Sequence, residues 1–428
     1  MSRPAPRIPG FDPNLVEALQ IEAARDDHAP GRSIPTVPLA EHRNHTPFPA
    51  QYFQSVDQHG EVFHVVALRA SFDLTRTSAD GSLAWADEQP PLVTEDHWSG
   101  EPNHSCPLWE SDFAPYKPKC DVLVANAVSR PPIGMLSALT GHKATRWGCG
   151  ISLTWSDPQG ASWQWVKQLA VTGPRKFGRA GLSAPSLCAE VPIDWRWACG
   201  GQIKQPTQDQ VGADGQLLQA AGSQRWQIDE RNPLGLGLCT DAGQPAPQLE
   251  LSLDQPYHGG PAAGYTPVSL TPLARAWLPR RHLAGTYDNA WLKQQWPLPP
   301  LDFDFAYWNC APADQQIDHP GPGAQIVLLN LYSPSASLKP LRWPAEADGR
   351  WHGRLPPNEL YALWRLHAGP MIDRPLNLDT LVVDMATRQI HATYRAVLSA
   401  QADVRVVETR MTEVSAAQSS APTAQEHT

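Results

Sequence analysis

The sequence has no apolar stretch long enough to cross a bilayer and no cluster of basic residues. A transmembrane helix needs about 20 consecutive, mostly apolar residues. Binding to nucleic acid depends on Lys and Arg side chains that neutralise phosphates. The formal net charge of -9 also disfavours a nucleic-acid partner. We therefore expect neither membrane insertion nor nucleic-acid binding.

Cysteine is sparse, and its pattern matches neither a disulfide framework nor a zinc site. The seven cysteines are widely spaced, odd in number and include no C-x-x-C pair. Small secreted domains carry even sets of cysteines, and structural zinc sites use close pairs. The stretch from Met1 to Gly10 is rich in proline and lacks the apolar core of a secretory signal. We expect reduced thiols in a cytoplasmic protein.

The common catalytic signatures are missing as well. The sequence contains no G-x-S-x-G elbow, no G-x-x-x-x-G-K phosphate loop and no H-E-x-x-H zinc motif. His97 and His104 come closest to a pair of metal ligands, but no nearby Cys or third His supports them. We therefore predict a protein that is not an enzyme, with no catalytic residue, no cofactor and no metal.

Proline and tryptophan are abundant, with 44 and 17 residues respectively. Proline interrupts long helices and favours short strands and turns. Apolar residues alternate from Val62 to Leu74, from Cys149 to Trp155 and from Trp163 to Val171, as they do in half-buried strands. We predict a mainly β fold built of antiparallel sheets, either one sandwich-like unit or two β lobes, with few short helices and long ordered loops.

Several local elements follow from the same patterns. Asp80-Gly81 predicts a hairpin turn, and Asp157 to Gly160 predicts another. The stretch from Val122 to Val128 is apolar on both faces, which is typical of a central strand. The remaining predictions are a buried strand at Ile326–Leu331, a short helix carrying Leu360, Leu363, Trp364 and His367, a hairpin of Thr380–Val383 with Ile390–Leu398, and a strand at Val404–Val407.

Composition along the chain suggests five regions. Residues 1–43 are a proline-rich leader with a short helix from Pro13 to about Arg25. Residues 44–201 form an N-terminal β lobe, and residues 232–410 form a C-terminal β-rich lobe. Between them, residues 202–231 are polar and rich in Gln and Gly, which predicts a long loop or linker. Residues 411–428 are expected to be a disordered tail.

The stretch from Arg280 to Gln316 is the densest in aromatic, proline and acidic residues, and it follows neither a helix nor a strand period. We interpret it as an ordered, irregular surface. Gly285 and Pro312 should set turns, and Asp288 and Asp314 should accept backbone N–H bonds there. The candidate partner-binding residues are Tyr287, Trp291, Trp296, Asp302, Asp304, Tyr307, Trp308, Asp314 and Gln315.

Two of these residues have competing interpretations. On a strand, Asp302 and Asp304 would share one face beside Tyr307 and Trp308. The two carboxylates would then suit a glycosidase acid and nucleophile on an aromatic platform that binds sugar. With Asp314 or Asp318 they would suit a hard cation. We favour a third reading, in which both carboxylates accept N–H bonds in proline-flanked turns, because such turn chemistry is common. Trp291 and Trp296 should lie on different faces of a short helix, one buried and the other exposed.

An ordered series of motifs resembles one bacterial family. The series comprises Asn44–Phe48, Ala70–Leu74, Asp87–Leu92, Ser111–Val124, Gly173–Phe177, Cys199–Gly201, Asn232–Gly237, Pro261–Pro267, and Ala284–Asp288 through Asp314–Gln316. In these motifs the chain is similar to the type VI secretion accessory proteins, first catalogued as a domain of unknown function and later understood as effector adaptors. The sequence departs from that pattern at Asn126, where the family usually has Gly, and at Tyr394, where it usually has Trp.

The resemblance implies a cytoplasmic adaptor or chaperone without enzymatic activity. Such a protein would bind a toxic effector, often one with a PAAR domain, and help load it on the VgrG spike. A stiff aromatic surface suits protein binding because rigid side chains lose little entropy. The alternatives are a carbohydrate-active β-protein, either a hydrolase using Asp302 and Asp304 or a lectin using a Trp-rich surface, and a structural baseplate component.

Overall fold

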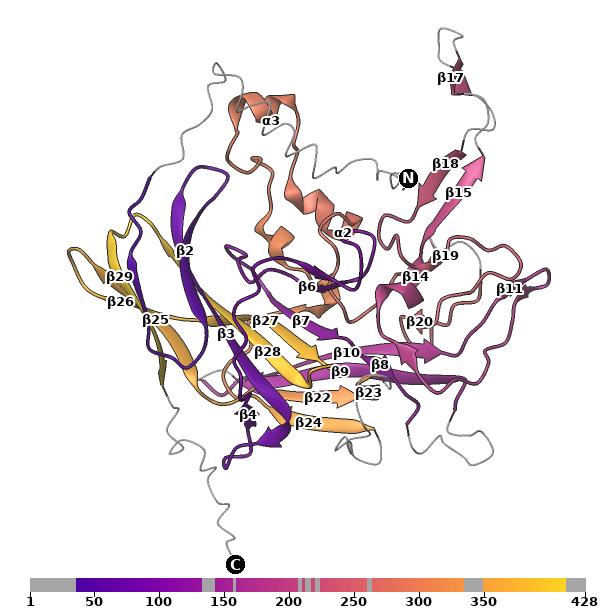
Figure 1. Ribbon diagram of the computed structural model, residues 1–428, viewed down its shortest axis with the longest axis horizontal. Helices are drawn as coiled ribbons and strands as arrows, with labels where there is room; N and C mark the ends of the chain where they lie inside the picture. Colours follow the sequence, from indigo (N-terminus) through magenta and orange to yellow (C-terminus); the bar gives the residue numbers. More distant parts are fainter. Residues whose placement is uncertain are drawn as a thin grey trace, which may run out of the picture.

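The computed structural model describes residues 36–132, 143–156, 159–206, 210–211, 217–219, 224–259, 264–334 and 349–412 (Figure 1). Its secondary structure is mainly β, with a few short helices, which confirms the predicted fold class. The long strands form three sheets of seven, five and four strands. The predicted helix at residues 13–25 and the predicted tail beyond Thr412 lie outside the described residues, and Met411 and Thr412 belong to a strand.

The seven-stranded sheet is the centre of the fold. Its strands run in the order β2 (Ala50–Val56), β3 (Val62–Thr77), β28 (Gln389–Ser399), β27 (Asn377–Asp384), β7 (Cys120–Ala125) and β21 (Gln316–Ile317), and β4 (Leu83–Trp85) pairs with β3. The predicted hairpins β3–β4 and β27–β28 are both present. Strands β27 and β7 run parallel and lie far apart in sequence, so only the folded chain brings them together.

Strand β7 is buried on both faces, as its apolar pattern predicted. Val122 and Val124 belong to the main core. Leu123 and Ala125 face the other way and pack with Cys310, Ala311 and Val382 in a second cluster. The strand ends at Asn126, whose φ of 52° lies in the left-handed region. Asn adopts this region more readily than most residues, so it can stand where the resembling family has Gly.

The five-stranded sheet is antiparallel throughout. Its order is β20 (Leu249–Glu250), β10 (Ser162–Thr172), β9 (Arg146–Ser156), β22 (Gln325–Leu329) and β24 (Arg350–Arg354). The predicted hairpin is confirmed, because β9 and β10 pair from Ser156 opposite Ser162 to Arg146 opposite Thr172 without a shift in register. The predicted buried strand ends at Leu329, where Asn330 adopts a φ of 53° before β23 (Leu331–Tyr332) begins.

The four-stranded sheet corrects one prediction. Its order is β1 (Glu41–Asn44), β29 (Val404–Thr412), β25 (Glu359–Leu366) and β26 (Ile372–Pro375). The expected helix at residues 360–367 is strand β25. Leu360, Ala362 and Trp364 are buried at every second position, and the strand is paired on both sides. The spacing of Leu360, Leu363 and Trp364 also fits a helix, and pairing with distant strands decides the outcome.

One core joins these sheets. Val66 of the seven-stranded sheet, Ile151 of the five-stranded sheet and Trp364 of the four-stranded sheet all belong to the same cluster of buried side chains. Each of the two larger sheets contains strands from both residues 44–201 and residues 232–410. The expected boundary at 202–231 therefore does not separate two sheets or two cores.

Residues 202–231 also contain strands where the sequence predicted a loop. Strand β15 (Gln202–Pro206) pairs with β18 (Gln224–Ile228), and β16 (Gln210–Val211) pairs with β17 (Leu217–Gln219). Alternation is weak in this polar stretch, so its sequence carries little strand signal. The other short strands are β5 (His97–Trp98), β6 (Pro107–Trp109), β8 (Val128–Ser129), β11 (Phe177–Gly178), β12 (Gly181–Leu182), β13 (Val191–Pro192), β14 (Cys199–Gly200) and β19 (Leu236–Gly237). In the described ranges, no helix has the length and apolar character needed to span a membrane.

Candidate functional site

The candidate segment, residues 278–316, is a chain of short helices on the far side of the seven-stranded sheet from the main core. These helices are α2 (Leu278–Arg281), η4 (His282–Ala284), α3 (Asn289–Gln294), η5 (Phe305–Trp308) and η6 (Ala313–Gln315). Figure 1 shows α2 and α3 grouped together, away from β22 and β24. Cys310 and Ala311 fasten the segment to the sheet, because they pack against Leu123 and Ala125 of β7.

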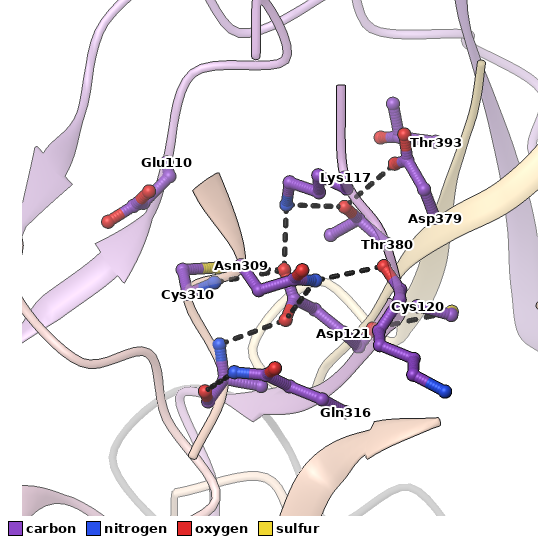
Figure 2. A network of polar contacts seen from close by, with 12 residues as sticks. Glu110, Lys117, Cys120, Asp121, Asn309, Cys310, Gln316, Asp379, Thr380 and Thr393 are labelled. Carbon is purple, nitrogen blue, oxygen red and sulfur yellow. Dashed lines mark hydrogen bonds and ion pairs between the residues drawn. The ribbon is translucent and has the colours of Figure 1, made fainter. Parts of the chain in front are cut away.

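A buried polar network attaches the same part of the segment to β7 (Figure 2). The carboxylate of Asp121 accepts hydrogen bonds from the backbone N–H groups of Cys310 at 3.0 Å and Ala311 at 3.1 Å. It also accepts one from Nδ2 of Asn309 at 3.1 Å and pairs with Nζ of Lys117 at 2.8 Å. The network was not predicted, although Asp121 is the one charged residue in the otherwise apolar run Cys120–Ala125.

Helix α3 is anchored by Trp291. Asp288 caps the helix, since its Oδ1 accepts a hydrogen bond from the Trp291 backbone N–H at 2.8 Å, as predicted. The Trp291 side chain is buried, and its Nε1 donates to the Leu298 carbonyl at 3.0 Å. Trp296 lies beyond the end of α3 and is half-buried, with its ring centroid 5.8 Å from that of Trp291. The prediction that the two rings lie on different faces of one helix is therefore wrong, because they touch.

Tyr287 covers the outer side of this pair. Its ring packs edge-on against Trp291 with centroids 4.7 Å apart, and 37% of the residue remains exposed. Burial of the rest of the side chain raises the pKa of Tyr287 to about 12, so the hydroxyl stays neutral. Leu301, in the same segment, is 61% exposed. Tyr287 thus combines an exposed part with packing against the buried Trp291.

Asp302 and Asp304 both act as turn residues. Oδ1 of Asp302 accepts from the Thr286 backbone N–H at 2.9 Å and Oδ2 accepts from Thr286 Oγ1 at 2.7 Å, and these bonds lower the pKa of Asp302. Asp304 caps η5 by accepting from the Ala306 N–H at 2.8 Å. A glycosidase acid needs a raised pKa. The geometry therefore fits the favoured turn reading and gives the catalytic alternative no support.

The hard-cation alternative also lacks support in these contacts. Asp314 pairs with Lys167, and Asp318 pairs with Lys119, so a lysine already neutralises each carboxylate. In the described ranges of the chain, no group of three or more His, Cys, Asp or Glu side chains is placed to hold a metal. His97 pairs with Trp109 in the short β5–β6 ladder.

Two arginines stack on the aromatic rings of η5. The guanidinium carbon of Arg275 lies 5.1 Å from the ring centroid of Trp308, and that of Arg280 lies 5.5 Å from the ring centroid of Tyr307. Arg280 is buried and forms an ion pair with Glu110. The half-buried rings of Tyr307 and Trp308 are therefore each held in place by a neighbouring guanidinium group.

The end of the segment connects to strand β10. The Asp314 carbonyl accepts a hydrogen bond from Trp165 Nε1 at 2.9 Å, and its carboxylate pairs with Lys167. The prediction that the Asp314 side chain accepts a backbone N–H is therefore wrong, because the carboxylate forms an ion pair with Lys167 instead. Gln315 is fully buried and donates from Nε2 to the Ser269 carbonyl at 2.8 Å. It supports the surface from beneath and cannot touch a partner directly.

An apolar pocket of about 300 Å³ lies where the segment meets β10. Its lining includes Pro279, Pro312, Val268 and Leu273, with Lys167 and Asp314 also on its wall. On the same strand, Trp163 is 52% exposed and Val166 is 50% exposed. Alternation along a strand does not reveal which strand lies at the edge of a sheet, so the sequence contains no sign of this exposed pair.

Six of the seven cysteines are poorly suited to nucleophilic chemistry, because burial raises their thiol pKa values. All seven lie in the described ranges, and none is in a disulfide. Burial raises the pKa of the Cys106, Cys149 and Cys199 thiols to about 12 and that of Cys188 to about 11. A thiol must lose its proton to attack a substrate, so these groups are inert near neutral pH.

Comparison with known proteins gives one result that bears on identity. No curated protein and no solved structure matches the chain. A family model described as "Uncharacterized protein conserved in bacteria (DUF2169)" matches residues 59–395, which is well over half of the sequence. These residues run from the turn before β3 into β28 and include the whole candidate segment. The chain therefore belongs to this conserved bacterial family of uncharacterized proteins.

Proposed function

We propose that this protein is a non-enzymatic adaptor that binds another protein through the outer side of the 278–316 segment and the adjoining part of β10. The observation that carries the proposal is the combination of exposed apolar side chains with a rigid base. Tyr287, Leu301 and Trp163 are exposed, while Trp291 and the Asp121 network hold the segment in place. Ordered surfaces of this kind bind with little loss of conformational entropy.

The proposed setting is a type VI secretion system in the cytoplasm. Its support is the resemblance of the motifs from Asn44 to Gln316 to the effector adaptors of that system. The proposed partners are a toxic effector, often PAAR-containing, and the VgrG spike on which the effector is loaded. The turn roles of Asp302 and Asp304 and the raised thiol pKa values are in keeping with a non-enzymatic protein.

Co-purification tests this proposal. The full chain, with an affinity tag, is expressed together with the effector, VgrG and PAAR proteins encoded beside it, and the purified material is analysed by mass spectrometry and size exclusion. We expect a stoichiometric complex with the effector. A matched sample in which an unrelated protein of similar size carries the tag controls for adhesion to the resin. Recovery of the chain alone from every combination would reject the adaptor function.

A further inference from the structure

Over more than half of its length, strand β10 has an edge that no described strand covers. In the five-stranded sheet, β20 covers only Ala170 and Val171 of β10. The backbone N–H of Thr172 donates to Gln248 on that side at 2.8 Å, and Gln248 Nε2 donates to the Thr172 carbonyl at 2.9 Å. Because backbone groups alternate in direction along a strand, those of Gln164, Val166 and Gln168 point to the same side. No described residue pairs with them there.

This edge lacks the usual protection against pairing. Natural proteins place charged residues, proline or bulges on exposed edges. The run from Ser162 to Val166 has no charge and no proline, and the ladder with β9 has no bulge. The Lys167 side chain points inward and pairs with Asp314, so its charge does not prevent another strand from pairing with this edge.

Two other edge strands in the same fold are protected. Strand β24, at the opposite edge of the five-stranded sheet, carries Arg350, His352 and Arg354. Strand β26, at the edge of the four-stranded sheet, carries Asp373, Arg374 and Pro375. Strand β2, at the edge of the seven-stranded sheet, has no charge or proline either. The β10 edge therefore shares its lack of protection with β2 and differs in this respect from β24 and β26.

The pocket of about 300 Å³ lies on the Lys167 side of β10. A strand added to this edge would continue the sheet, and its alternate side chains would point to that side. One of them could enter the pocket between Pro312 and Leu273. Recognition by strand addition gains affinity from main-chain hydrogen bonds and specificity from such pockets.

We propose that the β10 edge, from Ser162 to Gln168, binds an extended segment of a partner protein by β-strand addition, with one apolar side chain of that segment in the pocket. The inference rests on the proposed protein-binding function and specifies its mode. A second copy of β10 is a poor occupant, because its inward residues Trp165 and Lys167 are already bound to Asp314 of their own chain. The expected partner segment is extended, largely uncharged, and apolar at alternate positions.

Amide exchange gives the first test. In the free protein the N–H groups of Gln164, Val166 and Gln168 should exchange much faster than those of Trp163, Trp165 and Lys167, which pair with β9. The probe is a 12-residue peptide selected from a displayed random library against the full chain. Its binding should slow exchange at the first three positions by at least tenfold and leave the second three unchanged. Protection elsewhere in the chain but not at these amides would overturn the proposal.

Substitution gives the second test. Val166→Pro removes an edge N–H without removing a hydrogen bond to β9, and should weaken peptide binding at least tenfold. The matched control, Val166→Thr, keeps the N–H and should stay within about threefold of wild type. Equal binding by Val166→Pro and wild type, or failure of the library to yield any binder, would also overturn the proposal. Concentration-dependent dimers lost in Val166→Pro would assign the edge to a second copy instead.

The same variant separates this inference from the proposed function. In the co-purification experiment, an effector retained by wild type and lost from Val166→Pro supports both. An effector retained equally by both proteins leaves the adaptor function intact and refutes strand addition at β10. Peptides that bind the β10 edge while no effector co-purifies would support the edge and count against the adaptor function.

Discussion

Lys117 Nζ lies 2.8 Å from Asp121 Oδ2, and both side chains are buried beneath the 278–316 segment. Burial alone would lower the pKa of Lys117, but the Asp121 carboxylate outweighs this and raises it. The lysine thus stays charged. Figure 2 shows that Asp121 also lies next to Asn309 and Cys310. This one carboxylate of β7 therefore binds both Lys117 and the candidate segment.

Removing that carboxylate should be costly. Asp121→Ala removes the ion-pair partner of the buried Lys117 and leaves the N–H groups of Cys310 and Ala311 without their acceptor. Loss of one partner from a buried ion pair costs about 3–5 kcal/mol. Asp121→Asn should cost less, because the amide oxygen still accepts one N–H bond. Urea unfolding measures both, and a loss below about 1 kcal/mol for Asp121→Ala would contradict this account.

Gly285 is the turn residue whose replacement should be least tolerated. Its φ is 82°, and a Cβ there would lie 2.8 Å from both Asp302 Oδ1 and Pro300 Cβ. Its ψ is -175°, and this combination of angles is populated essentially by glycine alone and costs another residue about 1–3 kcal/mol. Overpacking adds about 1–3 kcal/mol. Gly285→Ala should therefore destabilise by about 2–6 kcal/mol in all.

Gly81→Ala is the matched control for this backbone effect. Gly81 has a similar φ of 79°, and no atom lies within 4 Å of the added Cβ. It should lose only the conformational part, about 1–2 kcal/mol. Equal losses in the two variants, measured by thermal unfolding, would show that the contact with Asp302 and Pro300 does not matter.

The alternation of apolar residues was sufficient to predict most strands, but it did not predict which strands pair with one another. The alternation from Val62 to Leu74 and from Trp163 to Val171 reports burial, and both stretches are strands. The order of strands depends on pairing between residues far apart, such as β27 with β7. The open edge of β10 therefore could not be predicted from its own residues, and the strand β25 was mistaken for a helix.

The sequence predicted where the candidate segment lies, but not the contacts that hold it in place. Its proline, aspartate and aromatic density predicted an ordered surface, and Gly285, Asp288, Asp302 and Asp304 have the expected turn roles. The anchor in Asp121 and the pairing of Asp314 with Lys167 were missed. Both depend on partners more than 140 residues away in sequence, which no local spacing encodes.

His391 should make stability depend on pH. The ring is buried, with Nδ1 2.8 Å from Ser71 Oγ, and burial together with nearby Arg69 lowers the pKa of His391 to about 3. The unfolded chain binds a proton at this ring near pH 6.5, whereas the folded chain does not. The contribution of the neutral ring is therefore complete above about pH 6.5 and is lost as the pH falls towards 3.

The measurement is the free energy of unfolding at pH 7.5, 6.0 and 5.0 for wild type and His391→Gln. Between about pH 6.5 and pH 3 the wild-type slope should be steeper by up to about 1.4 kcal/mol per pH unit, the value of one proton. We expect His391→Gln to have a smaller free energy of unfolding than wild type at pH 7.5, and to lose less of it as the pH falls. Parallel slopes would mean that His391 is not held neutral in the folded protein.

Trp291 and Trp296 should separate stability from binding, although their rings touch. Trp291 is buried and hydrogen-bonded to Leu298, so Trp291→Ala should cost about 3–5 kcal/mol of stability. Trp296 is half-buried, so Trp296→Ala should melt closer to wild type. If Trp296 contacts the effector, its truncation should lose roughly 2 kcal/mol of binding, about thirtyfold in affinity.

Melting temperature and effector co-purification are measured for each variant, with Trp291→Phe as the control that keeps an aromatic ring in the buried site. We expect Trp291→Ala to melt early, Trp291→Phe to recover most of the loss, and Trp296→Ala to fold but release its partner. Wild-type stability and full effector retention in both alanine variants would mean that this part of the segment neither anchors the fold nor meets the partner. Binding would then have to be sought at the β10 edge alone, where Val166→Pro tests it independently of either tryptophan.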